Sequence, residues 1–267
     1  MRRLFIGACT IALFTVSHKL ASQSPDTRPR FEEFEVATIK PTPPDWKGGR
    51  YIRMTSPQRF FAPNFSVRAL IAAAYGLSPP VIVGGPGWLD ADRYDIAAVT
   101  PGDVRPNLDE QMAMLRKLLI ERCKLTFHRE EREFSVYALT VNRNGPKLKA
   151  STAPANDPPE LVNQVYPGEG VRLPAHNATM AQFVAMMQRS IFDRPVLDRT
   201  GLPGRYDFDL EWTPDEFQFD GTLKDNPAST KPGIFAALQE QLGLKLEATR
   251  GPVLAMIIDQ VVRPSDN

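Results

Sequence analysis

Apolar and polar side chains alternate along several short stretches of the chain, which is the pattern of strands buried on one side. The first such stretch covers residues 34–40, and Pro41, Pro43 and Pro44 end it because proline cannot donate a ladder hydrogen bond. We predict further strands over residues 94–99, 123–128, 134–141, 205–212, 244–247 and 253–261.

Apolar residues recur at helical spacing in four other segments. We predict helices over residues 67–75, 108–122, 180–187 and 234–242. A short polar side chain in front of a helix can accept hydrogen bonds from the first free backbone N–H groups. Asn64 or Ser66 would begin the first helix in this way, and Asn177 or Thr179 the third.

Two segments suggest interruptions between strands. Residues 129–133 are all charged, so they form either the tip of a hairpin or the solvated face of a strand. In a hairpin, residues 134–141 would return as the partner of residues 123–128. The Arg-Gly-Pro sequence at residues 250–252 predicts another turn.

The tripeptide Arg-Tyr-Asp occurs at residues 93–95 and again at 205–207, each time behind a glycine-containing turn. Asn64 and Asn177 lie 113 residues apart, and Tyr94 and Tyr206 lie 112 apart, so the order of predicted elements repeats. We therefore predict an α+β fold with two related halves. Each half would be a small mixed or antiparallel sheet with two helices packed on one face.

The predicted organisation has five parts. They are a signal peptide (1–21), a flexible leader (22–33), a first α+β repeat (34–149), a proline-rich linker (150–168) and a second repeat (169–267). The signal peptide is indicated by Arg2 and Arg3 followed by an apolar run too short to span a bilayer. We expect a periplasmic or extracellular protein with no transmembrane span after cleavage. The apolar run before Cys9 is too short for a lipoprotein signal, so we do not expect a lipid anchor there.

Charge and composition exclude some partners. Residues 1–21 carry three basic residues and no acid, so their removal changes the formal net charge from +1 to −2. A nucleic-acid-binding protein would need a basic face, so we expect none of that class. We predict no cofactor and no metal, because the two histidines beyond the signal peptide, His128 and His176, stand far apart. Cys123, alone after cleavage, is expected to be a buried apolar residue.

Three carboxylates follow one another at every second position of a predicted strand. Asp207, Asp209 and Glu211 would share one sheet face, where paired carboxylates can perform acid–base catalysis or hold Ca²⁺. The alternative is a solvated face opposite Phe208, Leu210 and Trp212. The first copy has an acid only at Asp95.

The repeated Arg-Tyr-Asp tripeptide also has two interpretations. The arginines can pair with nearby carboxylates while the tyrosines pack against helices, which is a structural role. Alternatively, aromatic side chains form platforms for a ligand, and the arginines recognise an anion. The candidate ligand-binding residues are Trp88, Arg93, Tyr94, Arg205, Tyr206, Asp207, Asp209, Glu211 and Trp212.

Several motifs resemble one family of exported proteins of unknown function that is expanded in soil acidobacteria. They lie at residues 34–41, 85–89, 93–96, 118–122, 196–202, 204–208 and 238–244. The family carries no established activity and so supplies no catalytic residues. In some members a similar domain is fused to an antibiotic-sensor-type membrane metallopeptidase, which implies a sensing or binding role outside the membrane.

Each half also resembles, at the level of its element order, the short N-terminal domain of secretins and TonB-dependent transporters. That domain is a small interaction module of the envelope. We therefore expect a non-enzymatic binding or protein-interaction module whose partner is an envelope protein or an extracellular ligand. The alternative is an extracytoplasmic hydrolase that uses Asp207, Asp209 or Glu211.

Overall fold

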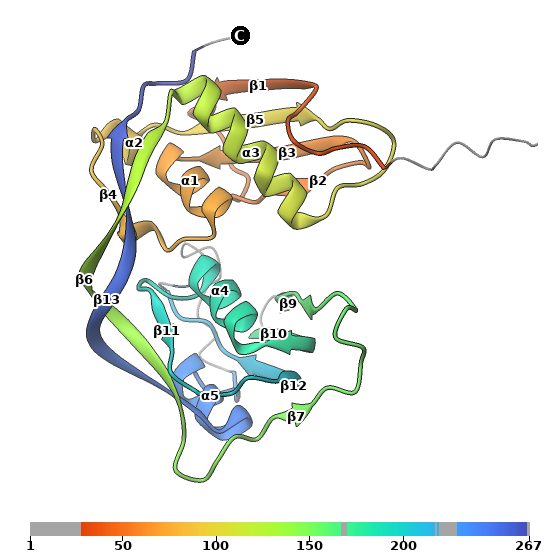
Figure 1. Ribbon diagram of the computed structural model, residues 1–267, viewed down its shortest axis with the longest axis vertical. Helices are drawn as coiled ribbons and strands as arrows, with labels where there is room; N and C mark the ends of the chain where they lie inside the picture. Colours follow the sequence, from red (N-terminus) through yellow and green to blue (C-terminus); the bar gives the residue numbers. More distant parts are fainter. Residues whose placement is uncertain (1–27, 167–169, 217, 219–228, 266–267) are drawn as a thin grey trace, which may run out of the picture.

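The computed structural model describes residues 28–166, 170–216, 218 and 229–265. The protein has an α+β fold with two lobes, joined by two long strands, β6 (Thr126–Val141) and β13 (Leu244–Gln260). In Figure 1 the first lobe lies above the second, and the two long strands run along the left side of both.

The first lobe is built on an antiparallel sheet with the strand order β1-β5-β3-β2. Its strands are β1 (Val36–Pro41), β2 (Arg53–Met54), β3 (Arg59–Phe65) and β5 (Tyr94–Val99). Its helices are α1 (Val67–Tyr75), the single-turn α2 (Trp88–Ala91) and α3 (Leu108–Cys123), with a 3₁₀ turn at Pro79–Val81. Helices α1 and α3 cover one face of this sheet (Figure 1).

The second lobe has a sheet with the order β7-β12-β10-β8, and β9 also pairs with β10. Its strands are β7 (Lys149–Ala150), β8 (Glu160–Leu161), β9 (Gln164–Tyr166), β10 (Gly170–Thr179) and β12 (Arg205–Trp212). Its helices are α4 (Met180–Ser190) and α5 (Ile234–Leu242). The predicted linker region thus contributes β8 and β9 to this sheet, while the proposed domain boundaries stay a prediction.

Helices α1, α3 and α4 each begin after a residue whose side chain caps the free backbone N–H groups. Ser66 rather than Asn64 caps α1, and its side chain accepts a hydrogen bond from the N–H of Ala69. Thr179 rather than Asn177 caps α4, in a capping box with Gln182. Helix α3 begins with a capping box between Asn107 and Glu110, which was not predicted.

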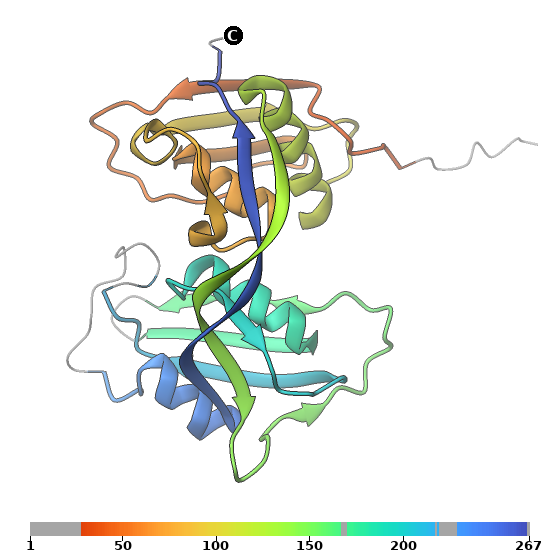
Figure 2. The same ribbon diagram turned by 60° about the vertical axis from the view of Figure 1, so that its left-hand side comes forward.

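The two long strands pair with each other, antiparallel, from Leu244 opposite Val141 to Gln260 opposite Thr126. Strand β4 (Ile82–Val83) pairs in parallel with the last part of β13, and β11 (Val196–Asp198) pairs in parallel with β6. The resulting sheet has the order β11-β6-β13-β4. Figure 2 shows the strong twist of the two long strands between the lobes.

This pairing corrects two predicted turns. Residues 129–133 are not a hairpin tip but the middle of the continuous strand β6, and they are exposed, as the solvated-face interpretation expects. Residues 250–252 also lie within a strand. At Gly251 a Cβ atom would come within 2.9 Å of the Leu197 side chain, so a larger residue there would require that side chain to shift. Local sequence suggested turns because the true partner of each strand is remote in the sequence.

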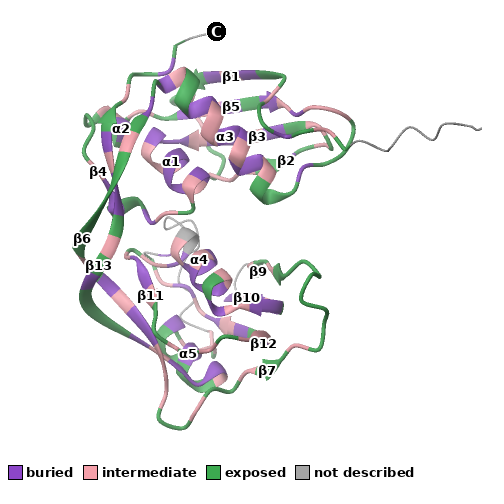
Figure 3. Ribbon diagram, in the orientation of Figure 1, coloured by how far each residue is buried: buried purple, intermediate pink, exposed green. Residues whose placement is uncertain are grey.

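Each lobe has its own hydrophobic core, and the long strands contribute to both. The first core includes Met256 and Ile258 of β13 and Leu125, which directly precedes β6. The second core includes Leu139 of β6 and Leu246 of β13. Figure 3 shows mostly exposed residues where the two strands pass between the lobes. Between the lobes the two strands are held together by their backbone pairing.

The order strand–helix–strand–strand–helix–long strand occurs in both lobes when the 3₁₀ turn and the single-turn helix α2 of the first lobe are left aside. That the two lobes arose by duplication stays a prediction. The predicted signal peptide and residues 22–27 of the predicted leader lie outside the described residues. In the part of the chain that is described, no helix is both long and apolar enough to cross a membrane.

Candidate functional site

Asp207 and Asp95 bind the backbone at equivalent bends of the two lobes. Oδ1 of Asp207 accepts a hydrogen bond from the N–H of Asn177 at 2.8 Å, and Oδ1 of Asp95 accepts one from the N–H of Asn64 at 2.8 Å. Both asparagines have a left-handed backbone, with φ of 52° and 60°, at a register shift in β10 and β3. The shared aspartate of the tripeptide therefore stabilises a bulge that leads into a helix.

The environment of Asp207 favours its charged form. The backbone N–H of Asn177, followed by the hydroxyl of Ser151, lowers the pKa of this carboxyl below the usual aspartate value. A general acid needs the opposite shift, because it must hold its proton near neutral pH.

Asp209 and Glu211 belong to an exposed network of ion pairs. The guanidinium of Arg172 lies 2.9 Å from Asp209 and 3.6 Å from Glu211, and the ammonium of Lys231 lies 3.1 Å from Glu211. The side chains of both acids are 41–53% exposed. Their common face is thus solvated and charge-balanced, with Phe208, Leu210 and Trp212 buried on the other side.

In the first lobe, Trp88 and Tyr94 come together around Asp92. Tyr94 is buried, and its hydroxyl lies 3.4 Å from Asp92. The cation over the Trp88 ring is not Arg93 but Arg263, 5.3 Å from the ring centroid, and Arg263 also pairs with Asp92 at 2.9 Å. The C-terminal segment is fastened to the first lobe by this group.

In the second lobe, the predicted residues have mainly packing roles. Arg205 donates a hydrogen bond to the carbonyl of Asn177 at 2.9 Å, and Tyr206 packs at the edge of the second core. Trp212 is fully buried, and its indole N–H donates to Gln218. The predicted aromatic side chains therefore lie in two separate cores and do not share one surface.

A groove lies instead between the edge strand β1 and helix α3 in the first lobe. Its volume is about 540 Å³, and its lining includes Val36 and Thr38 of β1 and Met114 and Leu118 of α3. Glu35, Glu121 and Arg122 also line it and supply charge. Strand β1 is outermost in its sheet among the described strands, and Val36 is 61% exposed.

The backbone N–H and C=O groups of successive β1 residues point alternately toward β5 and away from it. The N–H of Thr42 donates to the carbonyl of Arg93, which continues the register in which Lys40 faces Asp95. In an antiparallel pair every second residue points its backbone groups away from the partner. Ile39 is such a residue, so its N–H and C=O face the outer edge.

Sequence reasoning did not identify this groove. The available signal was that residues 36 and 37 are both apolar, although neighbouring residues of a strand point to opposite faces. One of the two had to be exposed or covered by another element. Ala37 is buried and Val36 is the exposed one.

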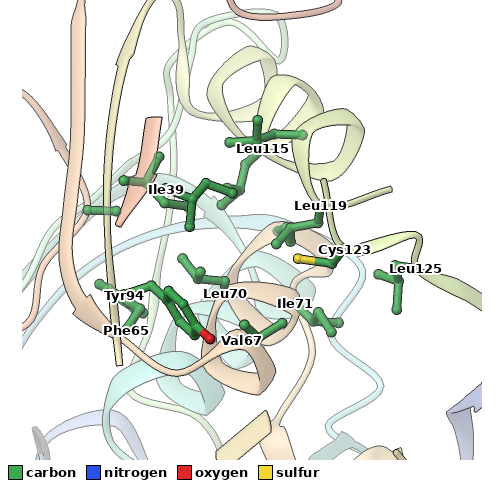
Figure 4. Packing of buried hydrophobic residues seen from close by; sticks show 14 of the residues in the cluster. Ile39, Phe65, Val67, Leu70, Ile71, Tyr94, Leu115, Leu119, Cys123 and Leu125 are labelled. Carbon is green, nitrogen blue, oxygen red and sulfur yellow. The ribbon is translucent and has the colours of Figure 1, made fainter. Parts of the chain in front are cut away.

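Cys123 is buried in the first core among Ile71, Leu119 and Leu125, as Figure 4 shows. This burial confirms the predicted apolar role, and it raises the pKa of the thiol to about 11. His128 lies on β6 with Nδ1 2.7 Å from Asp259. No group of three metal-ligating side chains was found within the described ranges.

The comparisons with known proteins identify a family but no characterised relative. No curated protein and no solved structure matches the chain. A family model described as "Protein of unknown function (DUF3738)" matches residues 68–261, which covers most of both lobes and the long strands between them. The chain therefore belongs to the DUF3738 family of proteins of unknown function.

Proposed function

We propose that the chain is an exported, non-enzymatic binding module of the cell envelope with a sensory role, and that it captures an extended polypeptide segment at β1. The observation that carries this proposal is the groove of about 540 Å³ between the edge strand β1 and helix α3. A strand edge beside a helix is the geometry by which a sheet accepts an added peptide strand.

The backbone of β1 supplies affinity without regard to sequence. The N–H and C=O of Ile39 face the outer edge and can pair with an added strand. Pro41 ends β1, and Pro43 and Pro44 follow, so pairing is confined to the part of the strand before them. The captured segment is therefore short, about five residues or 17 Å long.

The groove supplies selectivity. Alternate side chains of an added strand point toward and away from α3, so every second side chain enters the space lined by Met114 and Leu118. Both residues are apolar and almost fully buried, and an apolar side chain fits this lining best. We expect the captured segment to carry an apolar residue flanked by polar ones.

Selection from a random-peptide display library tests this proposal, with the chain from residue 22 onward as the target. Val36→Lys is the informative variant, because a lysine on an edge strand opposes strand addition and Val36 is exposed in the folded chain. We expect selected peptides to lose at least about tenfold in affinity, which corresponds to ~1.4 kcal/mol.

Leu254→Lys is the matched control. Leu254 is also an exposed aliphatic strand residue, at 57%, but lies on β13 away from the groove. Hydrogen exchange at the Ile39 amide should slow when peptide binds. The proposal fails if both variants weaken binding equally, or if bound peptides leave the exchange rate of Ile39 unchanged.

A further inference from the structure

Three aromatic rings from distant parts of the second lobe meet around a small pocket. Tyr137 of β6, Phe192 after α4, and Phe235 of α5 have ring centroids 5.4, 5.5 and 6.1 Å apart. Tyr137 and Phe192 are half-buried, and Phe235 is 42% exposed. The pocket that they line has a volume of about 280 Å³.

Two carboxylates line the same pocket. Asp193 accepts a hydrogen bond from the hydroxyl of Tyr137 at 3.2 Å, and Asp215 accepts one from the side-chain amide of Gln218 at 2.9 Å. Burial first, and then the negative charge of Asp193, raises the pKa of Tyr137. The tyrosine therefore stays neutral, and the acidic groups that line the pocket are the carboxylates of Asp193 and Asp215.

The protein already places a cation on one of these rings. The guanidinium of Arg194 lies 5.3 Å from the centroid of Tyr137, and its Nε lies 3.2 Å from Asp193. Aromatic faces attract cations through their quadrupole, most strongly where water is partly excluded. The side chain of Arg194 is 40% exposed, so it can move outward without opening the core.

We propose that this pocket binds a small alkylated ammonium ion, with the cation held against Tyr137, Phe192 and Phe235 and balanced by Asp193 and Asp215. Ligand pockets span about 300–1,000 Å³, so a volume of about 280 Å³ suits a small cation. Aromatic faces and carboxylates together favour an alkylated ammonium group over a neutral molecule of the same shape. This site is separate from the β1 groove, and neither proposal depends on the other.

Choline and its uncharged isostere 3,3-dimethyl-1-butanol are the probes that separate charge from shape. Titration of each into the chain from residue 22 onward, followed by calorimetry and by shifts of aromatic NMR signals, measures binding. We expect saturable binding of choline and little binding of the isostere. Sodium chloride, titrated alone at the same concentrations, should give no binding signal. Equal binding of both probes, or no saturable choline binding, would overturn the proposal.

Variants locate the site. Phe235→Ala removes an exposed ring, so folding should persist, and we expect choline affinity to fall about 5- to 30-fold, with Phe235→Tyr restoring most of it. Arg194→Ala should raise the affinity because it removes the competing cation from Tyr137. The control Leu254→Ala should change nothing. Unchanged affinity in Phe235→Ala, or a loss in Arg194→Ala, would show that choline binds elsewhere.

Discussion

The carboxylate of Asp207 accepts a hydrogen bond from the backbone N–H of Asn177 over 2.8 Å, at the bulge that precedes helix α4. Asp95 and Asn64 form the same contact before α1. In each lobe a side chain from the neighbouring strand thus holds a backbone conformation that residues other than glycine rarely adopt.

This contact predicts a difference between two aspartates of one strand. Asp207→Ala leaves the N–H of Asn177 without its acceptor, and we expect the free energy of unfolding to fall by about 1–2 kcal/mol. Asp209→Ala removes only an exposed ion pair with Arg172, and its cost should stay below about 1 kcal/mol. Urea denaturation measures both. Equal losses would contradict a structural role specific to Asp207.

The lowered pKa of Asp207 predicts how stability depends on pH. A carboxyl with a depressed folded-state pKa contributes its full stabilisation above the unfolded value of about 3.9, and loses it as the pH falls through the folded value. The stability gap between the wild-type chain and Asp207→Asn should therefore be constant from about pH 7 to 5 and shrink below about pH 4. Urea denaturation across this range provides the measurement, and a gap that widens on acidification would contradict it.

Cys123 should be chemically inert in the folded chain. Its side chain is buried, and the raised pKa of about 11 leaves almost no thiolate at pH 8. In a chain that begins at residue 22, Cys123 is the only cysteine. We expect no reaction with a disulfide reagent under native conditions and stoichiometric reaction in guanidinium chloride. Rapid native labelling would show that the first core opens readily.

The long strands predict that the two lobes unfold together. Leu115 in the first core and Leu173 in the second are both fully buried, so Leu→Ala at either position should cost about 2–5 kcal/mol. Because β6 and β13 contribute to both cores, we expect each variant to keep one transition, with coincident midpoints by tryptophan fluorescence and circular dichroism. Two separate transitions, each shifted by only one substitution, would contradict this coupling.

Local patterns predicted the elements well where a short segment determines its own structure. Helices α1 and α5 occupy the predicted residues, and Gly76 and Gly243 end them with left-handed backbone. Of the two candidate caps predicted for each helix, Ser66 caps α1 and Thr179 caps α4. The other two candidates, Asn64 and Asn177, lie at the bulges. Asparagine tolerates the left-handed backbone conformation that these bulges need.

The candidate site was predicted less well, because chemistry inferred from spacing did not include the partners of each group. Asp207, Asp209 and Glu211 have the spacing of a shared face, but each already has a partner. Asp207 accepts a hydrogen bond from the N–H of Asn177, Asp209 pairs with Arg172, and Glu211 pairs with Lys231. Those partners come from β10 and from the segment before α5, and no local pattern links them to β12.

The sequence by itself determined the α+β class, the helices, the repeated tripeptide and the membership of the DUF3738 family, since each depends on residues close together or on a motif order. Only the tertiary structure decided that β6 pairs with β13, that β1 forms an edge beside α3, and that three rings meet at Tyr137. Strand pairing is made by backbone groups that every residue carries, and so the side chains do not specify a remote partner in advance.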